Sequence, residues 1–350
     1  MGDSRVEDCR FAITGYTGLA GEILRLRNAN RPLAQTAQYL DWRYACSDGT
    51  PEPKVYWINN GAGRPCGMAA LIFRRFWANN ALQHVAVLGD ISLDAEMRGR
   101  GLGRSLLKFV AEDLDRNHPD TLAFVIPTEA AQRSLTSVGW TVGRRLKPYV
   151  FMLNPEEKLR RYLVSPWLAR EIAGQAGKLM ASVVRLHRKQ GYSLHMVGEL
   201  DDSFDTIWQR FDKTQFILSD RGIGALRWRY ANHPQHEFKF ASLDRHGQLA
   251  GYLIYQLSDV NRECSIYDLI LLEQEDLGCM LALLVLHYAD QGGIDTIRLL
   301  LNDDHPYSRQ LWKLGFVARD HSGVFQLYGR TAQTRLGESR WFLTYGDKDI

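Results

Sequence analysis

Cysteine is scarce in this sequence of 350 residues, and its five copies are scattered. Cys9, Cys46, Cys66, Cys264 and Cys279 form no Cys-x-x-Cys pair, and their number is odd. Disulfide frameworks and structural zinc sites usually need paired or clustered cysteines. The pattern argues against both and favours a reducing compartment, and no group of histidines has a spacing that we would assign to a metal.

Long hydrophobic runs are missing as well. The apolar stretch Leu281–Leu286 is far shorter than the roughly 20 residues that a membrane-spanning helix needs. Residues 1–10 are polar and acidic, unlike a secretory signal. We therefore expect a cytoplasmic protein without an integral membrane segment.

A strong net charge is the third absence. The sequence has 43 Lys and Arg against 40 Asp and Glu, which gives a formal net charge of +3. This balance permits an anionic ligand but does not indicate nucleic-acid binding. A chain of this length with 45% hydrophobic residues is expected to form two domains.

One stretch, residues 87–113, combines an apolar run, a glycine-rich loop and an amphipathic pattern. The run Val87–Leu93 predicts a strand, and apolar residues from Leu106 to Val110 continue at helical spacing after the loop. Glycines let a backbone approach a ligand closely, and the start of a helix attracts an anion. The junction therefore predicts a phosphate-binding loop, whose arginines add charged donors.

The pattern Arg98-x-x-Gly101-x-Gly103 resembles the pyrophosphate loop of the GNAT acyltransferases, which is Gln/Arg-x-x-Gly-x-Gly/Ala. The resemblance implies that the loop binds acetyl-CoA or another acyl-CoA, with the pantetheine arm along the preceding strand. The implied cofactor-binding residues are Ile91, Ser92, Leu93, Arg98, Gly99, Arg100, Gly101, Leu102, Gly103 and Arg104. The alternative is an ordinary surface turn between a strand and a helix.

The expected order of elements around the loop is also similar to that family, over about the first 153 residues. Strands are expected at Arg10–Thr14, Val55–Asn59, Cys66–Phe73, Ala81–Leu93, Thr121–Ile126 and Arg144–Leu153, and helices at Gly18–Asn28, after the loop and at Glu129–Ser137. Gly15-x-x-Gly18-x-x-Gly21 imitates a dinucleotide-binding fingerprint. The strand before it is short and no acidic residue ends a second β-branched strand, so we expect the first loop and helix of an acyltransferase fold there.

Markers of the first half recur in the same order in the second half. Trp42-Arg43-Tyr44-Ala45 returns as Trp228-Arg229-Tyr230-Ala231, and Leu88-Gly89-Asp90-Ile91 is echoed by Tyr267-Asp268-Leu269-Ile270. Markers in one order indicate an internal duplication. The counterpart of the glycine loop, Glu273–Cys279, carries three carboxylates and one glycine, and its charge would repel a diphosphate. We expect one CoA per chain, bound by the first half.

These observations predict an α/β (mixed α+β) protein of two tandem GNAT-like domains, each a mixed sheet flanked by helices. The expected divisions are 1–153 for the first domain, 154–190 for a connecting helical segment, 191–331 for the second domain and 332–350 for a C-terminal tail. The connecting helix has a basic side, which fits an interfacial membrane helix, but its small residues favour packing against the domains. The tail resembles the endings of tandem GNAT-like proteins found with bacterial surface-polysaccharide genes, which bears on the acceptor only.

Acyl transfer to an amine needs a neutral amine and a stabilised leaving thiolate. In the family, the base is often a carboxylate on the strand before the loop, which points to Asp90, with Ser92 on the same face two residues further along. The alternative is that Asp90 caps a turn or pairs with an arginine.

The acid for the thiolate departs from the family pattern. The tyrosine that many members have is replaced by Leu135 in the first half and by Leu311 in the second. Candidate substitutes are Thr136 and Ser137, which are next to Leu135, and Tyr149 on the closing strand.

The sequence therefore predicts an acyl-CoA-dependent N-acyltransferase that acts by direct attack in a ternary complex. The acceptor is expected to be a small-molecule primary amine, for which an amino sugar or surface-glycan precursor is our hypothesis. Two alternatives stay open: an acyl-carrier protein as donor, although it lacks the pyrophosphate end that Arg98 and Arg100 suit, and a non-catalytic acyl-CoA-binding module, which the missing tyrosines favour. The acceptor, the acyl chain length and a homodimer are left open.

Overall fold

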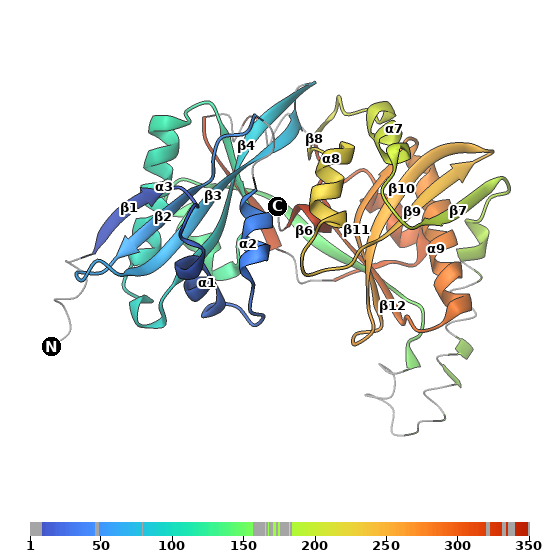
Figure 1. Cartoon of the computed structure of the whole chain (residues 1–350). Coiled ribbons are helices and arrows are strands. Elements are labelled where there is room, and N and C mark those ends of the chain that lie inside the picture. The colour runs from blue at the N-terminus through green and yellow to red at the C-terminus, as the bar shows by residue number, and fades with distance from the viewer. Residues whose placement is uncertain are drawn as a thin grey trace. The chain divides into compact units, whose positions relative to one another are not determined.

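The computed structural model of the chain (Figure 1) describes residues 9–45, 49–78, 80–156, 184–319, 323–330 and 340–348, with isolated positions at 165, 167, 171, 172, 174, 175, 182 and 334. The chain divides into two compact units. Unit 1 comprises residues 1–145 and 323–340, and unit 2 comprises residues 146–322 and 341–349.

Unit 1 is built on a mixed sheet with the strand order β1-β2-β3-β4-β5-β14-β6. The pairs β1–β2, β2–β3, β3–β4 and β5–β14 are antiparallel, whereas β4–β5 is parallel. The strands are β1 (Arg10–Thr14), β2 (Lys54–Asn59), β3 (Pro65–Ala78), β4 (Ala81–Leu93), β5 (Leu122–Val125), β6 (Thr141–Met152) and β14 (Gly323–Tyr328).

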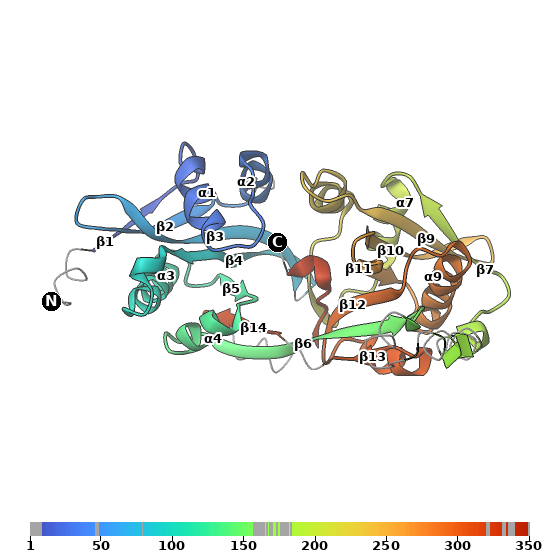
Figure 2. The same ribbon diagram turned by 90° about the horizontal axis from the view of Figure 1, so that it is seen from below.

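Helices cover both faces of this sheet, α1 (Ala20–Asn28) and α2 (Ala37–Tyr44) on one side and α3 (Leu102–Asn117) and α4 (Glu129–Thr136) on the other (Figure 2). The alternation of side chains along β2 explains the two layers. Tyr56 and Ile58 belong to the buried cluster that includes α3, whereas Val55 and Trp57 belong to the cluster that includes α1 and α2.

Unit 2 repeats the order of unit 1, which confirms the predicted tandem fold. Its sheet follows the order β6-β12-β11-β10-β9-β7, and β11–β12 is the parallel pair that corresponds to β4–β5. The strands are β7 (Tyr192–Val197), β8 (Phe216–Ser219), β9 (Lys239–Arg245), β10 (Gln248–Ser258), β11 (Glu263–Leu271), β12 (Thr296–Asn302), β13 (Val317–Ala318) and β15 (Arg340–Trp341). The helical elements are α7 (Asp202–Arg210), α8 (Ile223–Leu226), η2 (Arg227–Ala231), η3 (Gln274–Asp276), α9 (Leu277–Gln291), α10 (Ser308–Leu311), η4 (Trp312–Leu314) and η5 (Tyr345–Asp347).

Each unit is made of two separate stretches of the sequence, whereas the expected boundaries at 153 and 331 assume continuous domains. β14, near the C-terminus, lies between β5 and β6 in unit 1, whereas residues 146–152 of β6 pair with β12 in unit 2. Each unit therefore takes a strand from the other half of the chain. Alternation of side chains specifies which face of a strand is buried but not which sheet the strand joins, so the sequence pattern gives no sign of this exchange.

Most of the expected elements are present in the structure. β1 and β4 have the expected bounds, and β3 extends to Ala78. The expected packing of the connecting helix is wrong at two described positions, since Ile172 is 45% and Leu186 is 84% exposed. The other residues of its apolar face lie outside the described residues. Val184, which is adjacent to that face in the sequence, is buried. None of the described helices has the length and apolar character that crossing a membrane requires.

Candidate active site

The predicted phosphate loop lies at the junction of β4 and α3. β4 leads into a short 3-10 turn, η1 (Ala95–Met97), and then into four residues before α3. Two of them, Gly99 and Gly101, have φ angles of +74° and +78°, in the left-handed region that favours glycine. Gly101 is the N-cap of α3, where the first N–H groups of the helix lack intrahelical partners. The exposed basic side chains at this point are Arg98, Arg100 and Arg104.

β4 separates from β5 before it reaches this turn. Parallel pairing joins Val85–Val87 to Leu122–Phe124, and β5 ends one residue later. Over the described residues, the part of β4 from Leu88 to Leu93 has β3 as its neighbour and no pairing with β5. An open strand edge offers backbone N–H and C=O groups to an extended amide chain. The expected cofactor residues Ile91, Ser92 and Leu93 all lie on this segment.

Helix α3 packs closely on the open segment of β4. A Cβ at Gly103 would lie 3.3 Å from Cδ1 of Leu93, so glycine at this position lets the helix approach the strand. Leu102 beside it is buried in the core cluster. Gly103 and Leu102 therefore position the helix start, and the other residues of the loop remain exposed.

The loop is held from the side of α1. Arg25 Nη1 lies 2.9 Å from Asp94 Oδ1 at the end of β4. Arg98 Nη2 donates a hydrogen bond of 2.6 Å to Asn30 Oδ1, just after α1. The predicted pyrophosphate arginine is thus already oriented by a neighbouring side chain.

Asp90, the expected base, is buried on a β-bulge of β4. The register shifts between Met68 and Ala70, and Asp90 has a φ of +56°. The side chain accepts a hydrogen bond of 2.9 Å from Tyr44 and contacts three arginines. These are Arg27, Arg31 at 3.3 Å and Arg43 at 3.2 Å.

This environment keeps the carboxylate of Asp90 ionised. Burial raises its pKa, but the charges of Arg43, Arg27 and Arg31, together with the hydrogen bond from Tyr44, outweigh burial and hold the pKa well below its usual range. A carboxylate of such low basicity takes a proton from an amine poorly. The geometry does not support Asp90 as the base and instead fits the alternative of an arginine-paired carboxylate.

Sequence reasoning missed the arginines that surround Asp90. Arg27 and Arg31 lie on and just after α1, about sixty residues from Asp90, and carry no motif. Arg43 and Tyr44 do have a signal, because Trp-Arg-Tyr-Ala recurs in the second half together with the Asp-containing strand. The paired recurrence of these two motifs could have indicated that they contact each other.

The substitutes for the missing tyrosine are hydrogen-bonded to backbone carbonyls or belong to the other unit. Leu135 is fully buried in the core. Thr136 Oγ1 donates to the carbonyl of Gln132, and Ser137 Oγ donates to the carbonyl of Ser134. Tyr149 belongs to unit 2, where burial raises its pKa.

Unit 2 lacks the corresponding turn. α9 begins directly after η3, without the four residues that separate η1 from α3 in unit 1. Asp276, at the junction, accepts a hydrogen bond of 2.7 Å from Tyr192 and pairs with Arg245 at 3.3 Å. A Cβ at Gly278, in the first turn, would lie 3.3 Å from a ring nitrogen of His187. The start of α9 is therefore covered by side chains of its own unit.

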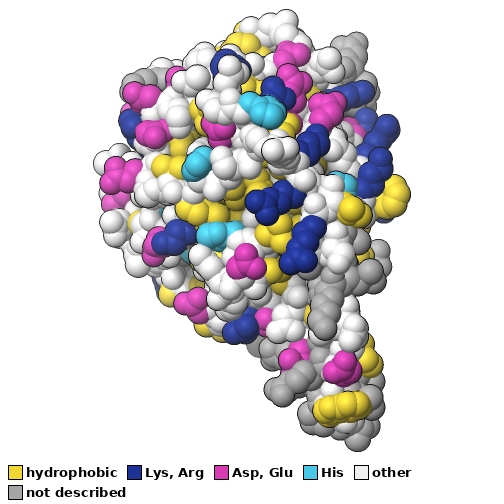
Figure 3. Space-filling model, turned by 90° about the vertical axis from the view of Figure 1, so that its right-hand side faces the viewer, with side chains coloured by type: hydrophobic (Ala, Val, Ile, Leu, Met, Phe, Trp, Pro, Cys, Tyr) yellow, Lys and Arg dark blue, Asp and Glu magenta, His cyan; other side chains and the backbone are white. Residues whose placement is uncertain are grey.

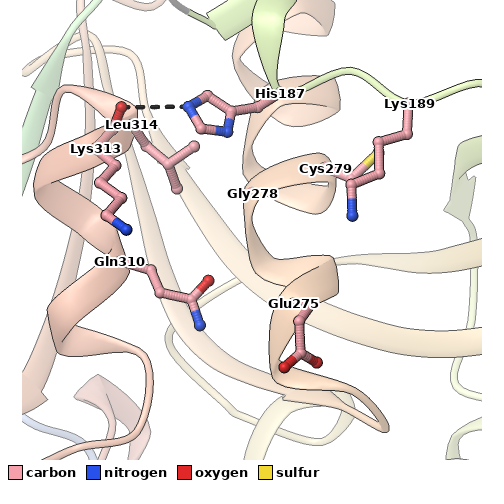
Figure 4. Close-up of a pocket in the computed structure, with 8 residues that line it drawn as sticks. All are labelled: His187, Lys189, Glu275, Gly278, Cys279, Gln310, Lys313 and Leu314. Carbon is pink, nitrogen blue, oxygen red and sulfur yellow. Dashed lines mark hydrogen bonds between the residues drawn. The ribbon is translucent and has the colours of Figure 1, made fainter.

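A pocket of about 440 Å³ remains beside the start of α9 (Figure 4). Figure 4 shows Gln310, Lys313 and Leu314 on one wall, Glu275 below, and His187 hydrogen-bonded to the carbonyl of Lys313. Lys189, Gly278 and Cys279 complete its lining. The pocket combines charges of both signs, unlike the arginine-rich turn of unit 1.

Charges are mixed elsewhere as well. On the face of the molecule in Figure 3, basic, acidic and hydrophobic side chains are interspersed. Within the part of the chain that the structure describes, no three His, Cys, Asp or Glu side chains are grouped as a metal site requires.

Comparison with known proteins gives a family match over part of the chain and a shared fold. Residues 22–137 match the sequence model of the Acetyltransferase (GNAT) family. No curated protein matches the sequence.

Several solved structures are similar. A protein from Enterococcus faecalis, described as a probable N-acyltransferase, aligns with a TM-score of 0.65 and 11% identity over 94% of this chain and 74% of its own. A GCN5-related N-acetyltransferase from Anabaena variabilis aligns with a TM-score of 0.63 and 11% identity over 91% of this chain and 72% of its own. A tandem GNAT protein from the clavulanic acid biosynthesis pathway has a TM-score of 0.55 and 16% identity over 91% of this chain and 98% of its own. Identities this low show the shared fold alone.

Proposed function

We propose that the protein is an acyl-CoA-dependent N-acyltransferase of the GNAT family, whose sequence model matches residues 22–137, and that its site lies in unit 1. The observation that carries this proposal is the open segment of β4 leading directly into the glycine turn at the start of α3. An extended arm with a diphosphate at one end needs both features, in this order along the chain. We infer that acetyl-CoA is the donor and that one site is present per chain.

In the proposed reaction, the nitrogen of a primary amine attacks the thioester carbonyl in a ternary complex. The C–N bond forms, the C–S bond breaks, the amine loses a proton to solvent and the thiolate of CoA takes one. The exposed Arg98, Arg100 and Arg104 and the N–H groups of α3 would bind the diphosphate. Backbone groups of Ile91–Leu93 would orient the pantetheine arm.

We assign Asp90 a positioning role and not that of a base, because it is buried among arginines. Ser92 lies two residues further along the open segment and stays the candidate to contact the reacting groups. An amino sugar or surface-glycan precursor stays our hypothesis for the acceptor.

Titration calorimetry with acetyl-CoA tests the donor site. We expect Arg98→Ala to weaken binding about tenfold, because a charge-assisted contact to a phosphate contributes roughly 1.5–3 kcal/mol. Arg116→Ala, which removes an exposed arginine at the far end of α3, is the matched control and should bind as the wild type does. Equal binding by both variants would argue against the proposed loop.

Release of free thiol from acetyl-CoA in the presence of primary amines then tests turnover. Binding without release on any amine would favour the non-catalytic alternative. Failure to bind acetyl-CoA, with transfer from an acylated carrier protein, would favour the carrier as donor.

A further inference from the structure

Each unit contains a buried aspartate that accepts a hydrogen bond from the tyrosine of its own copy of the repeated motif. In unit 1, Tyr44 Oη donates to Asp90 Oδ2 at 2.9 Å. In unit 2, Tyr230 Oη donates to Asp268 Oδ2 at 3.3 Å. The internal duplication therefore relates the two sites through this tyrosine–aspartate pair and the arginine that precedes the tyrosine.

Unit 2 supplies its site with a second carboxylate. Asp347, in η5 of the C-terminal segment, pairs with Arg221 Nη2 at 2.9 Å and with Arg229 Nη1 at 3.4 Å. The backbone N–H of Thr344 donates to the same carboxylate at 2.8 Å. Arg229 is the counterpart of Arg43 in the repeat. The chain itself thus places a carboxylate against the arginine that the two sites share.

The segment that carries Asp347 lies on the counterpart of the unit 1 site. A Cβ at Gly346 would collide with the hydroxyl of Tyr230, the counterpart of Tyr44. The ring of Tyr345 packs 4.5 Å from that of Tyr267, the counterpart of Gly89. This C-terminal segment therefore covers positions that correspond to Tyr44 and Gly89.

The second carboxylate completes the hydrogen bonds of Arg221, the fully buried arginine of unit 2. Arg221 is fully buried, and its Nε donates to Asp268 at 2.9 Å. Its Nη1 donates to the carbonyl of Ser219 at 2.9 Å, and its Nη2 donates to Asp347 at 2.9 Å. Two arginines meet two aspartates in a buried site, so the charges are balanced, and the Nε of Arg229 is the one buried guanidinium nitrogen of this pair that lacks a hydrogen-bond partner among the described residues.

In unit 1, three arginines share the single carboxylate of Asp90. Arg27 is 0% exposed, and its Nε and Nη2 have no hydrogen-bond partner among the described residues. Arg31 reaches Asp90 while its side chain stays 37% exposed, so it connects the cluster to solvent. Buried donors without partners are unfavourable by roughly 1–3 kcal/mol each, and more when they are charged. The site is short of the carboxylate that its copy receives from Asp347.

We propose that the acyl acceptor carries a carboxylate, which binds in unit 1 to Arg31 and Arg27 in the place that Asp347 takes in unit 2. This inference rests on the proposed N-acyltransferase function, because it names the class of acceptor. The substrate class is an amine that bears a carboxyl group, such as an amino acid or a carboxylated amino sugar. A neutral amino sugar has no carboxylate and would leave Nε and Nη2 of Arg27 without a hydrogen-bond partner.

Paired probes test the carboxylate directly. Glycine, β-alanine and 4-aminobutyrate place a carboxylate at increasing distance from the amine, and each is compared with its amide. Saturation-transfer NMR on the full chain, with and without CoA, measures binding to wild type, to Arg31→Gln and to Arg116→Gln. Arg31 is partly exposed, so its replacement should leave the fold intact, and Arg116 is the exposed control.

We expect at least one of the three carboxylate probes to bind wild type and Arg116→Gln about tenfold more tightly than the corresponding amide does. Arg31→Gln should lose that preference while its affinity for acetyl-CoA stays unchanged. Equal binding of acids and amides, a preference that survives Arg31→Gln, or no binding by any probe would overturn the proposal. The NMR measurement of probe binding is also made without CoA. A failure to bind acetyl-CoA would therefore count against the proposed function and not against the carboxylate site.

Discussion

The hydroxyl of Tyr44 donates a hydrogen bond of 2.9 Å to Asp90, a residue 46 positions further along the chain. This contact joins the end of α2 to the bulge in β4, within the segment of β4 that does not pair with β5. The same pair recurs as Tyr230 and Asp268 in unit 2. The repeated Trp-Arg-Tyr motif therefore has a structural purpose, which is to hold a helix against the bulged strand.

Replacement of Asp90 by asparagine should destabilise unit 1. The change leaves the guanidinium groups that surround it buried without a counter-charge, and breaking a buried ion pair from one side costs about 3–5 kcal/mol. Hydrogen exchange read separately for peptides of each unit measures the effect. Asp120→Asn, at an exposed position, is the control. Full stability together with lost turnover would instead revive Asp90 as the base.

The contribution of Asp90 should depend on pH in one direction. Burial raises its pKa, but the three arginines and Tyr44 outweigh burial and lower it, so the folded pKa lies below the unfolded value of about 3.9. A group of this kind stabilises the fold above its unfolded pKa, and the stabilisation is lost as the pH falls through about 4. The difference in unfolding free energy between wild type and Asp90→Asn should be constant near neutrality and shrink below about pH 4. A difference that grows on acidification would contradict the assignment.

Replacement of Asp347 by asparagine should act on unit 2 alone. Arg221 and Arg229 would keep one carboxylate between them, and we expect a loss of about 3 kcal/mol in the stability of that unit. Asp259→Asn, in the exposed turn after β10, is the control. The affinity for acetyl-CoA should stay within about twofold of wild type, because the loop belongs to unit 1. Faster exchange confined to unit 1 would argue against this account.

Local patterns in the sequence predicted the strands and the glycine turn well. β1 and β4 begin and end at the expected residues because alternation and turn residues are local properties. The loop was predictable for the same reason, since its glycines and the helix start are adjacent in the chain.

Long-range relationships were not predictable in the same way. Arg27 and Asp90 meet because α1 packs on the sheet, and no spacing rule covers residues so far apart. The entry of β14 into unit 1 is another such case, because pairing depends on a sheet edge and not on the strand's own pattern. The repeat is the one long-range signal that we used from the sequence, and it predicts the duplicated fold but not the contact between its two motifs.

The most direct test of a single acyl-CoA site in unit 1 compares two glycines by titration calorimetry with acetyl-CoA. Gly101 in the loop and Gly63 in the β2–β3 turn have nearly equal φ angles of +78° and +77°, and an added Cβ meets nothing within 4 Å at either. Gly101→Trp and Gly63→Trp therefore introduce similar backbone strain at different places. The account predicts one acetyl-CoA per chain for wild type and Gly63→Trp and no binding for Gly101→Trp. Unchanged binding by Gly101→Trp, or two equivalents per chain, would contradict it.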